Sequence, residues 1–373
     1  MEIIRLCRTF PRTDSPGAGL HCFNFSKYIK LQTLVFTKYS DSPILSIPEN
    51  AQVYEINYRD LSFKRKSESF LRLILILISK IWGELVFAYK INKKLRGIQA
   101  KPKIIHLHSI NYLFTSIYLK YKFNAKLIMN FGGTDLVRVK DNFLLKRVCQ
   151  KADAVLYVAE SMHDDLKDIF SNQLIACMGN GVDTDFFIPG SKNKKKFFLA
   201  VGNLRWQKGY EYLIDAFAVV AEKYPEYKLL IAGEGPDRNI LQRKINDLNL
   251  SKKTLLLGSQ SRNDVLRLFQ DSFAYVLSSV SEGFPKSVIE SIATETPVIV
   301  TDIGECKRLA KGVGLVVDAG SSNSLAEAMI SFIEDDSSYM KYITNCNVVR
   351  DNYSWQKMVS VVDMVYKEII MNE

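Results

Sequence analysis

The sequence lacks the patterns that mark several classes of protein. Its six cysteines are scattered and no two form a CxxC pair, which predicts reduced thiols and neither a disulfide framework nor a zinc site. Only four histidines occur in 373 residues, too few for a histidine-rich metal centre. Arg5 and Arg8 interrupt the apolar stretch at the N-terminus, so no signal peptide is expected. We therefore expect a cytoplasmic protein.

A nucleic-acid-binding pattern is missing as well, although the charge would permit one. The formal net charge is +10, which favours acidic partners such as nucleotides, phospholipid surfaces or nucleic acid. No stacking motif of aromatic and basic residues and no recognised nucleic-acid-binding module is present. We therefore expect no nucleic-acid partner.

What the sequence does contain is an alternation of apolar strands with helices, repeated in both halves. This alternation predicts the α/β class, with two doubly wound parallel sheets and a ligand cleft between them. The polar, charged stretch 190–196 is the predicted boundary between an N-terminal domain, 1–190, and a C-terminal domain, 197–353.

The stretch 278–290 is the most informative part of the second half. It follows the apolar run 273–277 and enters a helix at Pro285, a residue favoured in the first helical turn. Glu282 on the turn and Glu290 on the helix could hold a hydroxyl-rich ligand, and N–H groups at the helix start favour an anion. The alternative is a surface helix with an acidic cap.

Glycine-bearing loops follow other strands. Gly202 to Gly209 contains Arg205 and Lys208, a candidate phosphate clamp; the alternative is two exposed basic side chains. Gly17 and Gly19 follow the first strand and permit close approach of a ligand, or form a plain turn. The third glycine of the dinucleotide fingerprint is absent there.

Two further segments leave alternatives open. The segment 64–96 combines basic clusters with an apolar run that charged residues interrupt, so it is a poor membrane span. It suits either an interfacial helix on anionic lipid or a helix facing the core with solvated lysines. Asp183 and Asp185 imitate a metal-binding DxD, but they follow Asn-Gly, which favours a turn.

Taken together, five motifs in register resemble the retaining glycosyltransferases of family 4, whose GT-B fold has two Rossmann-like domains facing across a cleft. The resemblance covers nearly the whole chain and implies that the last helix, about 354–373, packs back on the first domain. The motifs are Glu282-Gly283-Phe284-Pro285 with Glu290 (E-x7-E), Gly202 to Gly209, Gly233-Glu234-Gly235-Pro236, Asn180-Gly181-Val182-Asp183 and Pro16-Gly17-Ala18-Gly19.

The resemblance implies transfer of a sugar from a nucleotide-diphosphate sugar to a glycan or lipid-linked acceptor. Glu290 would grip the ribose hydroxyls, Glu282 would face the transferred sugar, and Lys208 would neutralise the diphosphate. Many members have arginine where this chain has Asn203, and Arg205 is expected to substitute. The remaining donor contacts would come from Gly17, Gly19, Gly202, Gly233, Gly235, Gly283, Phe284 and Pro285.

The N-terminal domain would bind the acceptor. Many members have His-Gly where this chain has Gly132-Gly133, so a histidine role at that position is not supported. Asp135 is expected to contact the sugar or acceptor, with His108 nearby. Two competing functions are a sugar-nucleotide epimerase and a non-catalytic binding protein, and the intact Glu282, Glu290 and Lys208 argue against a dead site.

The expected chemistry needs no cofactor and no metal, because fixed cations and helix-start N–H groups can stabilise the charge on a nucleoside diphosphate leaving group. The expected role is synthesis of cell-surface polysaccharide or lipopolysaccharide. The enzyme would work in the cytoplasm or on the inner face of the cytoplasmic membrane, which it would contact through 64–96.

Overall fold

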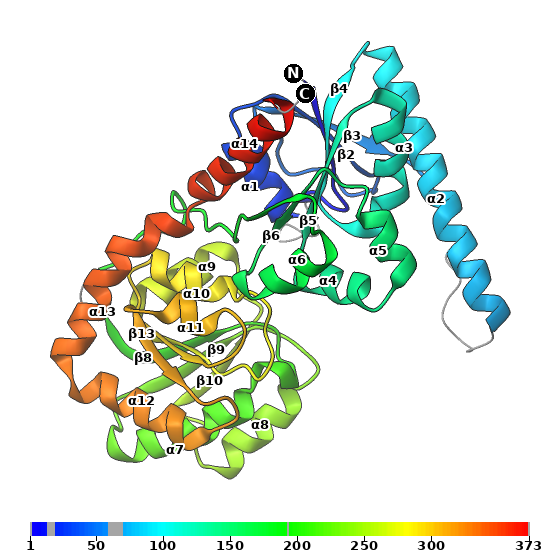
Figure 1. Cartoon of the computed structure of the whole chain (residues 1–373). Coiled ribbons are helices and arrows are strands. Elements are labelled where there is room, and N and C mark those ends of the chain that lie inside the picture. The colour runs from blue at the N-terminus through cyan, green and yellow to red at the C-terminus, as the bar shows by residue number, and fades with distance from the viewer. Residues whose placement is uncertain (1, 13–18, 59–69, 192–193, 372–373) are drawn as a thin grey trace. The chain divides into compact units, whose positions relative to one another are not determined.

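The computed structural model describes residues 2–12, 19–58, 70–191 and 194–371 (Figure 1). The chain divides into two compact units: unit 1, Met1–Gly179 with Met358–Glu373, and unit 2, Asn180–Lys357. Each unit contains one sheet whose paired strands all run parallel, as the α/β prediction requires.

The division falls earlier than the predicted linker at 190–196. Val182 pairs with Ser354, and Phe187 lies in a buried core of unit 2, so the segment after Gly179 belongs to the second unit. The division depends on how this segment packs, and the polar composition of 190–196 carries no information about that packing.

Unit 1 is built on a seven-stranded sheet in the order β3-β2-β1-β4-β5-β6-β7. Its central strands are mostly buried and apolar, as expected where helices cover both faces of a parallel sheet, although Arg5, His106 and Asn130 are buried polar residues within them. The strands are β1 (Glu2–Leu6), β2 (Thr33–Lys38), β3 (Ala51–Ile56), β4 (Pro102–Leu107), β5 (Lys126–Phe131), β6 (Ala154–Tyr157) and β7 (Leu174–Cys177).

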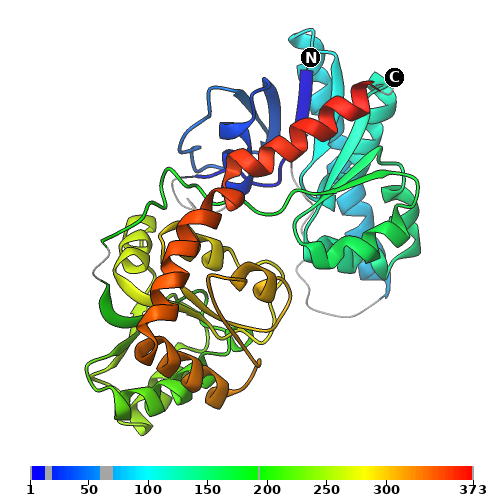
Figure 2. The same ribbon diagram turned by 60° about the vertical axis from the view of Figure 1, so that its left-hand side comes forward.

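Unit 1 contains helices from both ends of the chain. α14 (Trp355–Met371), red in Figure 2, continues into this unit, where the hydroxyl of Tyr366 lies 2.5 Å from Nδ1 of His106 on β4. α2 (Phe70–Gly97) is the longest helix and lies beside α3 (Leu113–Phe123). The others are α1 (Leu20–Tyr28), α4 (Gly133–Lys140), α5 (Phe143–Cys149) and α6 (His163–Ile169), with 3-10 turns η1 (Ile110–Tyr112) and η2 (Glu160–Met162).

Unit 2 has a six-stranded sheet in the order β10-β9-β8-β11-β12-β13, and a buried apolar cluster lies on each of its faces. Its strands are β8 (Lys195–Val201), β9 (Lys228–Ala232), β10 (Thr254–Gly258), β11 (Ser272–Leu277), β12 (Val298–Thr301) and β13 (Gly314–Val317). Its helices are α7 (Tyr210–Lys223), α8 (Arg238–Asp247), α9 (Arg262–Asp271), α10 (Lys286–Ala293), α11 (Cys306–Ala310), α12 (Ser322–Glu334) and α13 (Asp336–Val349), with η3 (Trp206–Lys208) and η4 (Arg350–Tyr353).

Candidate active site

Three of the predicted loops of unit 2 meet at one edge of its sheet. β9, β8 and β11 are neighbours and run parallel, so the loops that follow them emerge at the same edge. The backbone N–H of Gly202 donates to the carbonyl of Ala232 at 3.0 Å, and that of Val280 donates to the carbonyl of Gln207 at 2.8 Å. The strand order therefore gathers residues that lie far apart in the sequence.

The loops pack so closely that two positions demand glycine. Gly233 has φ +151°, and a Cβ there would collide with the carbonyl of Gly202. Gly209 has φ +62°, and a Cβ there would collide with the carbonyl of Ser278. Side-chain-bearing residues avoid such φ values, so these glycines keep the three loops in contact.

An ion pair lies at the centre of the three loops. Nζ of Lys208, on η3, lies 2.6 Å from Oε1 of Glu282, and the two side chains are 20% and 21% exposed. The hydroxyl of Ser278 donates to the carbonyl of Lys208 at 2.9 Å, which ties η3 to the strand end. The structure thus brings together the predicted diphosphate cation and the predicted sugar-facing carboxylate.

Glu290 lies in the second turn of α10, which begins directly after Pro285, and it is half-buried. Burial raises the pKa of the Glu290 carboxyl, while Lys286 and Arg262 oppose that shift. Among the described residues, no hydrogen bond or ion pair engages this carboxylate. Its oxygens therefore remain available to accept hydrogen bonds from a ligand.

The other residues of unit 2 that are predicted to contact the nucleotide sugar differ in exposure and packing. Arg205 is exposed at the start of η3. Gly283 is exposed, and a Cβ there would meet open space, whereas a Cβ at Gly235 would collide with the carbonyl of Leu204. Phe284 packs against one of the two apolar clusters. Gly235 therefore has a packing role, and Gly283 leaves the surface beside Glu282 open.

Sequence reasoning missed two neighbours of the ion pair. The hydroxyl of Tyr210 is buried without a hydrogen-bond partner among the described residues, and a Cβ on Gly202 would lie 3.0 Å from it. Gly304 packs under the turn, where a Cβ would lie 2.6 Å from the carbonyl oxygen of Glu282. The only sequence signal for Tyr210 is its place directly after Lys208-Gly209.

The predicted residues of unit 1 lie on separate elements. Gly19 precedes α1 with φ +79° and packs on the backbone of Thr9, while Gly17 is outside the described residues. Asp135 is in the first turn of α4, where burial raises the pKa of its carboxyl and Arg138 opposes the shift. His108 follows β4 and is half-buried.

The two aspartates of the DxD-like pair, Asp183 and Asp185, differ in burial and contacts. The side chain of Asp183 is 8% exposed and lies 3.2 Å from the guanidinium of Arg262, which also stacks on Phe186. Asp185 is exposed. The first carboxylate is thus engaged in packing the turn, in line with the turn interpretation of this motif.

Two family profiles match consecutive parts of the chain. "Glycosyltransferase Family 4" matches residues 58–186, and "Glycosyl transferases group 1" matches residues 181–347. The chain belongs to the group 1 glycosyltransferases. This membership confirms the predicted enzyme class and the resemblance on which it rested.

Two proteins of similar sequence are also named as glycosyltransferases. An uncharacterized glycosyltransferase of Methanocaldococcus jannaschii is 44% identical over 105 residues, which are 28% of this chain and 25% of that protein. The N-acetylgalactosamine-N,N'-diacetylbacillosaminyl-diphospho-undecaprenol 4-alpha-N-acetylgalactosaminyltransferase of Campylobacter jejuni is 29% identical, with 67% of this chain and 71% of that protein covered.

Solved structures share the fold. Sucrose-phosphate synthase from Thermosynechococcus elongatus has a TM-score of 0.77 at 15% identity, with 100% of both chains covered. HepE from Anabaena, solved in complex with UDP, has a TM-score of 0.73 at 14% identity, with 99% of this chain and 100% of that chain covered. At these identities the likeness is one of fold, and it confirms the predicted GT-B architecture.

Proposed function

We propose that this glycosyltransferase moves a sugar, with retention of anomeric configuration, from a nucleoside-diphosphate sugar to a lipid-linked glycan acceptor. The product would belong to a cell-surface polysaccharide or lipopolysaccharide. The observation that carries the donor half of this proposal is the ion pair of Lys208 and Glu282, 2.6 Å apart where the three loops meet. The UDP complex of HepE and the diphospho-undecaprenol named for the Campylobacter relative support the two substrate classes.

Each residue of the donor site has a proposed task. The ammonium of Lys208 turns from Glu282 to the diphosphate when the donor binds. From there it stabilises the negative charge that grows on the leaving group. Arg205, exposed beside it, adds a second cation. Glu282, released from Lys208, faces the sugar, and Glu290 accepts hydrogen bonds from the ribose hydroxyls.

The diphosphate step in this proposal needs no metal. Lys208, Arg205 and the N–H groups at the start of α10 together supply positive charge and hydrogen-bond donors, although Pro285 itself contributes no N–H. Unit 1 would supply the acceptor side through Asp135. Addition of Mg²⁺ or Mn²⁺ is expected to leave turnover unchanged.

A face of α2 supports an acceptor at a membrane surface. Trp82, Leu85 and Tyr89 are 58%, 49% and 64% exposed, and their spacing places them on one helical face. Lys93 and Arg96 continue that face and are also exposed. Aromatic and basic side chains on one face suit the interface of an anionic bilayer.

The opposite face of the same helix is buried through Phe87, Ile91 and Leu95. Within the described part of the chain, no helix has both the length and the apolar character to cross a bilayer. We therefore propose peripheral binding to the inner face of the cytoplasmic membrane. The basic cluster Lys64, Arg65 and Lys66 of the same proposal lies outside the described residues.

The experiment that tests the function is a donor and acceptor screen with the full chain. UDP-, GDP- and ADP-sugars are incubated with the enzyme, with and without short-chain polyprenyl-diphosphate-linked sugars, and products are analysed by mass spectrometry and NMR. We expect one donor to give an acceptor-dependent glycoside with the anomeric configuration of the donor. An isomerised nucleotide sugar without acceptor, or an inverted product, would contradict the proposal.

A further inference from the structure

A second cluster of reactive side chains lies in unit 1. Cys7 follows β1, His108 follows β4, and Cys22 lies in the first turn of α1. β1 and β4 are neighbours in the sheet, and the N–H of His108 donates to the carbonyl of Leu6 at 3.1 Å. Strand pairing thus places Cys7 and His108 side by side, with Cys22 facing them from the helix.

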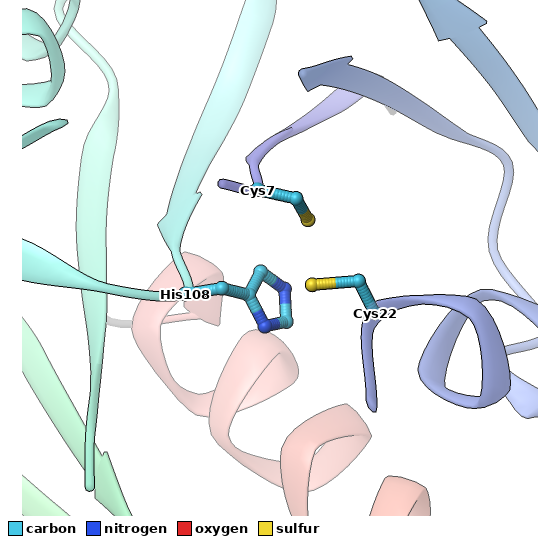
Figure 3. Close-up of side chains that lie close together, drawn as sticks. All are labelled: Cys7, Cys22 and His108. Carbon is cyan, nitrogen blue, oxygen red and sulfur yellow. The ribbon is translucent and has the colours of Figure 1, made fainter. Parts of the chain in front are cut away.

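The three side chains converge (Figure 3). The sulfur atoms of Cys7 and Cys22 and a ring nitrogen of His108 all lie within 4.8 Å of one another. In a tetrahedral zinc site with two thiolates and one imidazole, these atoms are about 3.5–3.8 Å apart. Each of these distances would have to shorten by at most about 1.3 Å to reach that geometry.

The surroundings of His108 provide an outer shell. Nδ1 of His108 lies 3.2 Å from the amide nitrogen of Asn130, and the amide oxygen of Asn130 lies 2.7 Å from Nε2 of His106. An outer-shell partner on one nitrogen of a histidine orients the ring so that the other nitrogen can bind a metal. If the amide of Asn130 is turned over, its oxygen faces Nδ1 of His108 in place of its nitrogen. In that orientation the amide accepts a hydrogen bond from Nδ1–H.

Arg5 is a cation that lies beside the cluster. Its Nε donates to Nε2 of His108 at 2.9 Å, and its other nitrogens donate to Ser26 and to the carbonyl of Cys22, the latter at 3.2 Å. Metal binding would replace the bond to His108 while the other two remain. Two thiolates and a divalent ion form a neutral group, so Arg5 would not repel the occupied site.

We infer that Cys7, Cys22 and His108 form a binding site for a zinc-like divalent metal ion. Cysteine sulfur and imidazole nitrogen are the ligands that such ions prefer, and three protein ligands leave one position for water or for His21, whose ring lies 5.7 Å from that of His108. Binding releases the two thiol protons. The ion would join the ends of the segment between Cys7 and Cys22, which includes the Gly19 turn.

The inferred metal site does not rest on the proposed function, so its test uses no nucleotide sugar. The full chain, reduced and stripped of metal, is titrated with Co²⁺ under nitrogen, and absorbance is recorded before and after Zn²⁺ is added. We expect one Co²⁺ per chain with intense thiolate-to-metal and tetrahedral ligand-field bands that Zn²⁺ abolishes. X-ray absorption of the zinc form should show two sulfur ligands at ~2.3 Å and nitrogen or oxygen at ~2.0 Å.

Variants assign the ligands. Cys7→Ser and Cys22→Ser should each lower the intensity of the thiolate band by at least half, because one of the two sulfur ligands is lost. Asn130→Ala, which removes the outer-shell contact to His108 together with the contact to His106, should weaken affinity by about 10–100-fold. Cys177→Ser, at the end of β7, is the matched control and should bind as the unaltered chain does. No bound ion, unchanged spectra in Cys7→Ser and Cys22→Ser, or fewer than two sulfur ligands by X-ray absorption of the unaltered chain would overturn the inference.

Discussion

The two units bring their candidate functional side chains together in different ways. In unit 2, Lys208, Glu282 and Glu290 all lie within thirteen residues after a strand end, and close-packed glycine loops position them. In unit 1, Cys7, Cys22 and His108 come from separate elements, and the pairing of β1 with β4 and the position of α1 bring them together. Short loop motifs are visible in a sequence, whereas a cluster built from distant elements appears only once the strand order is known.

The largest effect should come from removing the cation of unit 2. Lys208→Ala leaves Glu282 without its partner and the leaving group without a fixed charge, so we expect kcat to fall by about 10²–10³-fold. Steady-state transfer kinetics measure it. Lys223→Ala removes an exposed lysine of the same unit and should leave kcat unchanged. An unaltered kcat in Lys208→Ala would contradict the proposed role of this cation, and with it the contrast drawn between the two units.

A smaller effect should come from the exposed face of α2 in unit 1. Replacing Trp82 and Tyr89 together by alanine should weaken binding to anionic liposomes by at least tenfold, because burying roughly 100 Å² of aromatic surface is worth ~2.5 kcal/mol. Vesicle co-sedimentation measures the change. Ile240→Ala, an exposed apolar residue of unit 2, is the control. If the full chain does not bind such vesicles at all, the membrane part of the proposal fails.

The packing of the unit 2 loops can be tested with a matched pair of glycines. Gly233→Ala introduces a methyl group against the Gly202 carbonyl at φ +151°, and it should lower the free energy of unfolding by about 1–3 kcal/mol or more. Gly283→Ala, which meets open space, should change it little. Urea unfolding compares the two. Equal effects would mean that close packing does not position these loops.

The smallest expected effect concerns pH and unit 1. Glu84 accepts from the N–H of Thr115 at 3.0 Å, and burial raises the pKa of its carboxyl to about 7 although that hydrogen bond opposes the shift. The folded chain therefore holds a proton that the unfolded chain has lost. The stability that this proton gives is complete below about pH 4.5 and is lost as pH rises through about 7.

Glu84→Gln keeps an acceptor for Thr115 but cannot ionise. Its free energy of unfolding should therefore fall less than that of the unaltered chain between pH 5 and pH 8, by about 1 kcal/mol. Urea unfolding at both pH values measures the difference, with exposed Glu49→Gln as control. Parallel pH profiles for Glu84→Gln and the unaltered chain would show that this carboxyl does not titrate near neutrality.

The sequence predicted the α/β class, the two sheets and the glycine-bearing loops that meet at Lys208 and Glu282, because strand runs and glycine spacing are local. It did not reveal the buried hydroxyl of Tyr210 or the packing of Gly304 under Glu282, since neither belongs to a spaced motif. Scattered cysteines indicated no metal site, yet the neighbouring strands β1 and β4 bring Cys7 beside His108. The end of unit 1 was also hidden, because it depends on the pairing of Val182 with Ser354.

The most direct test of the central claim is calorimetric titration of the full chain with UDP, GDP and ADP, repeated with Glu290→Gln. We expect one nucleoside diphosphate to bind, and Glu290→Gln to weaken it by about 10–100-fold, since hydrogen bonds to a charged group are worth ~1.5–3 kcal/mol. Glu226→Gln, an exposed carboxylate of the same unit, should leave affinity unchanged. Binding of none of the three nucleotides, or equal affinity in Glu290→Gln, would contradict the assignment of the donor site to unit 2.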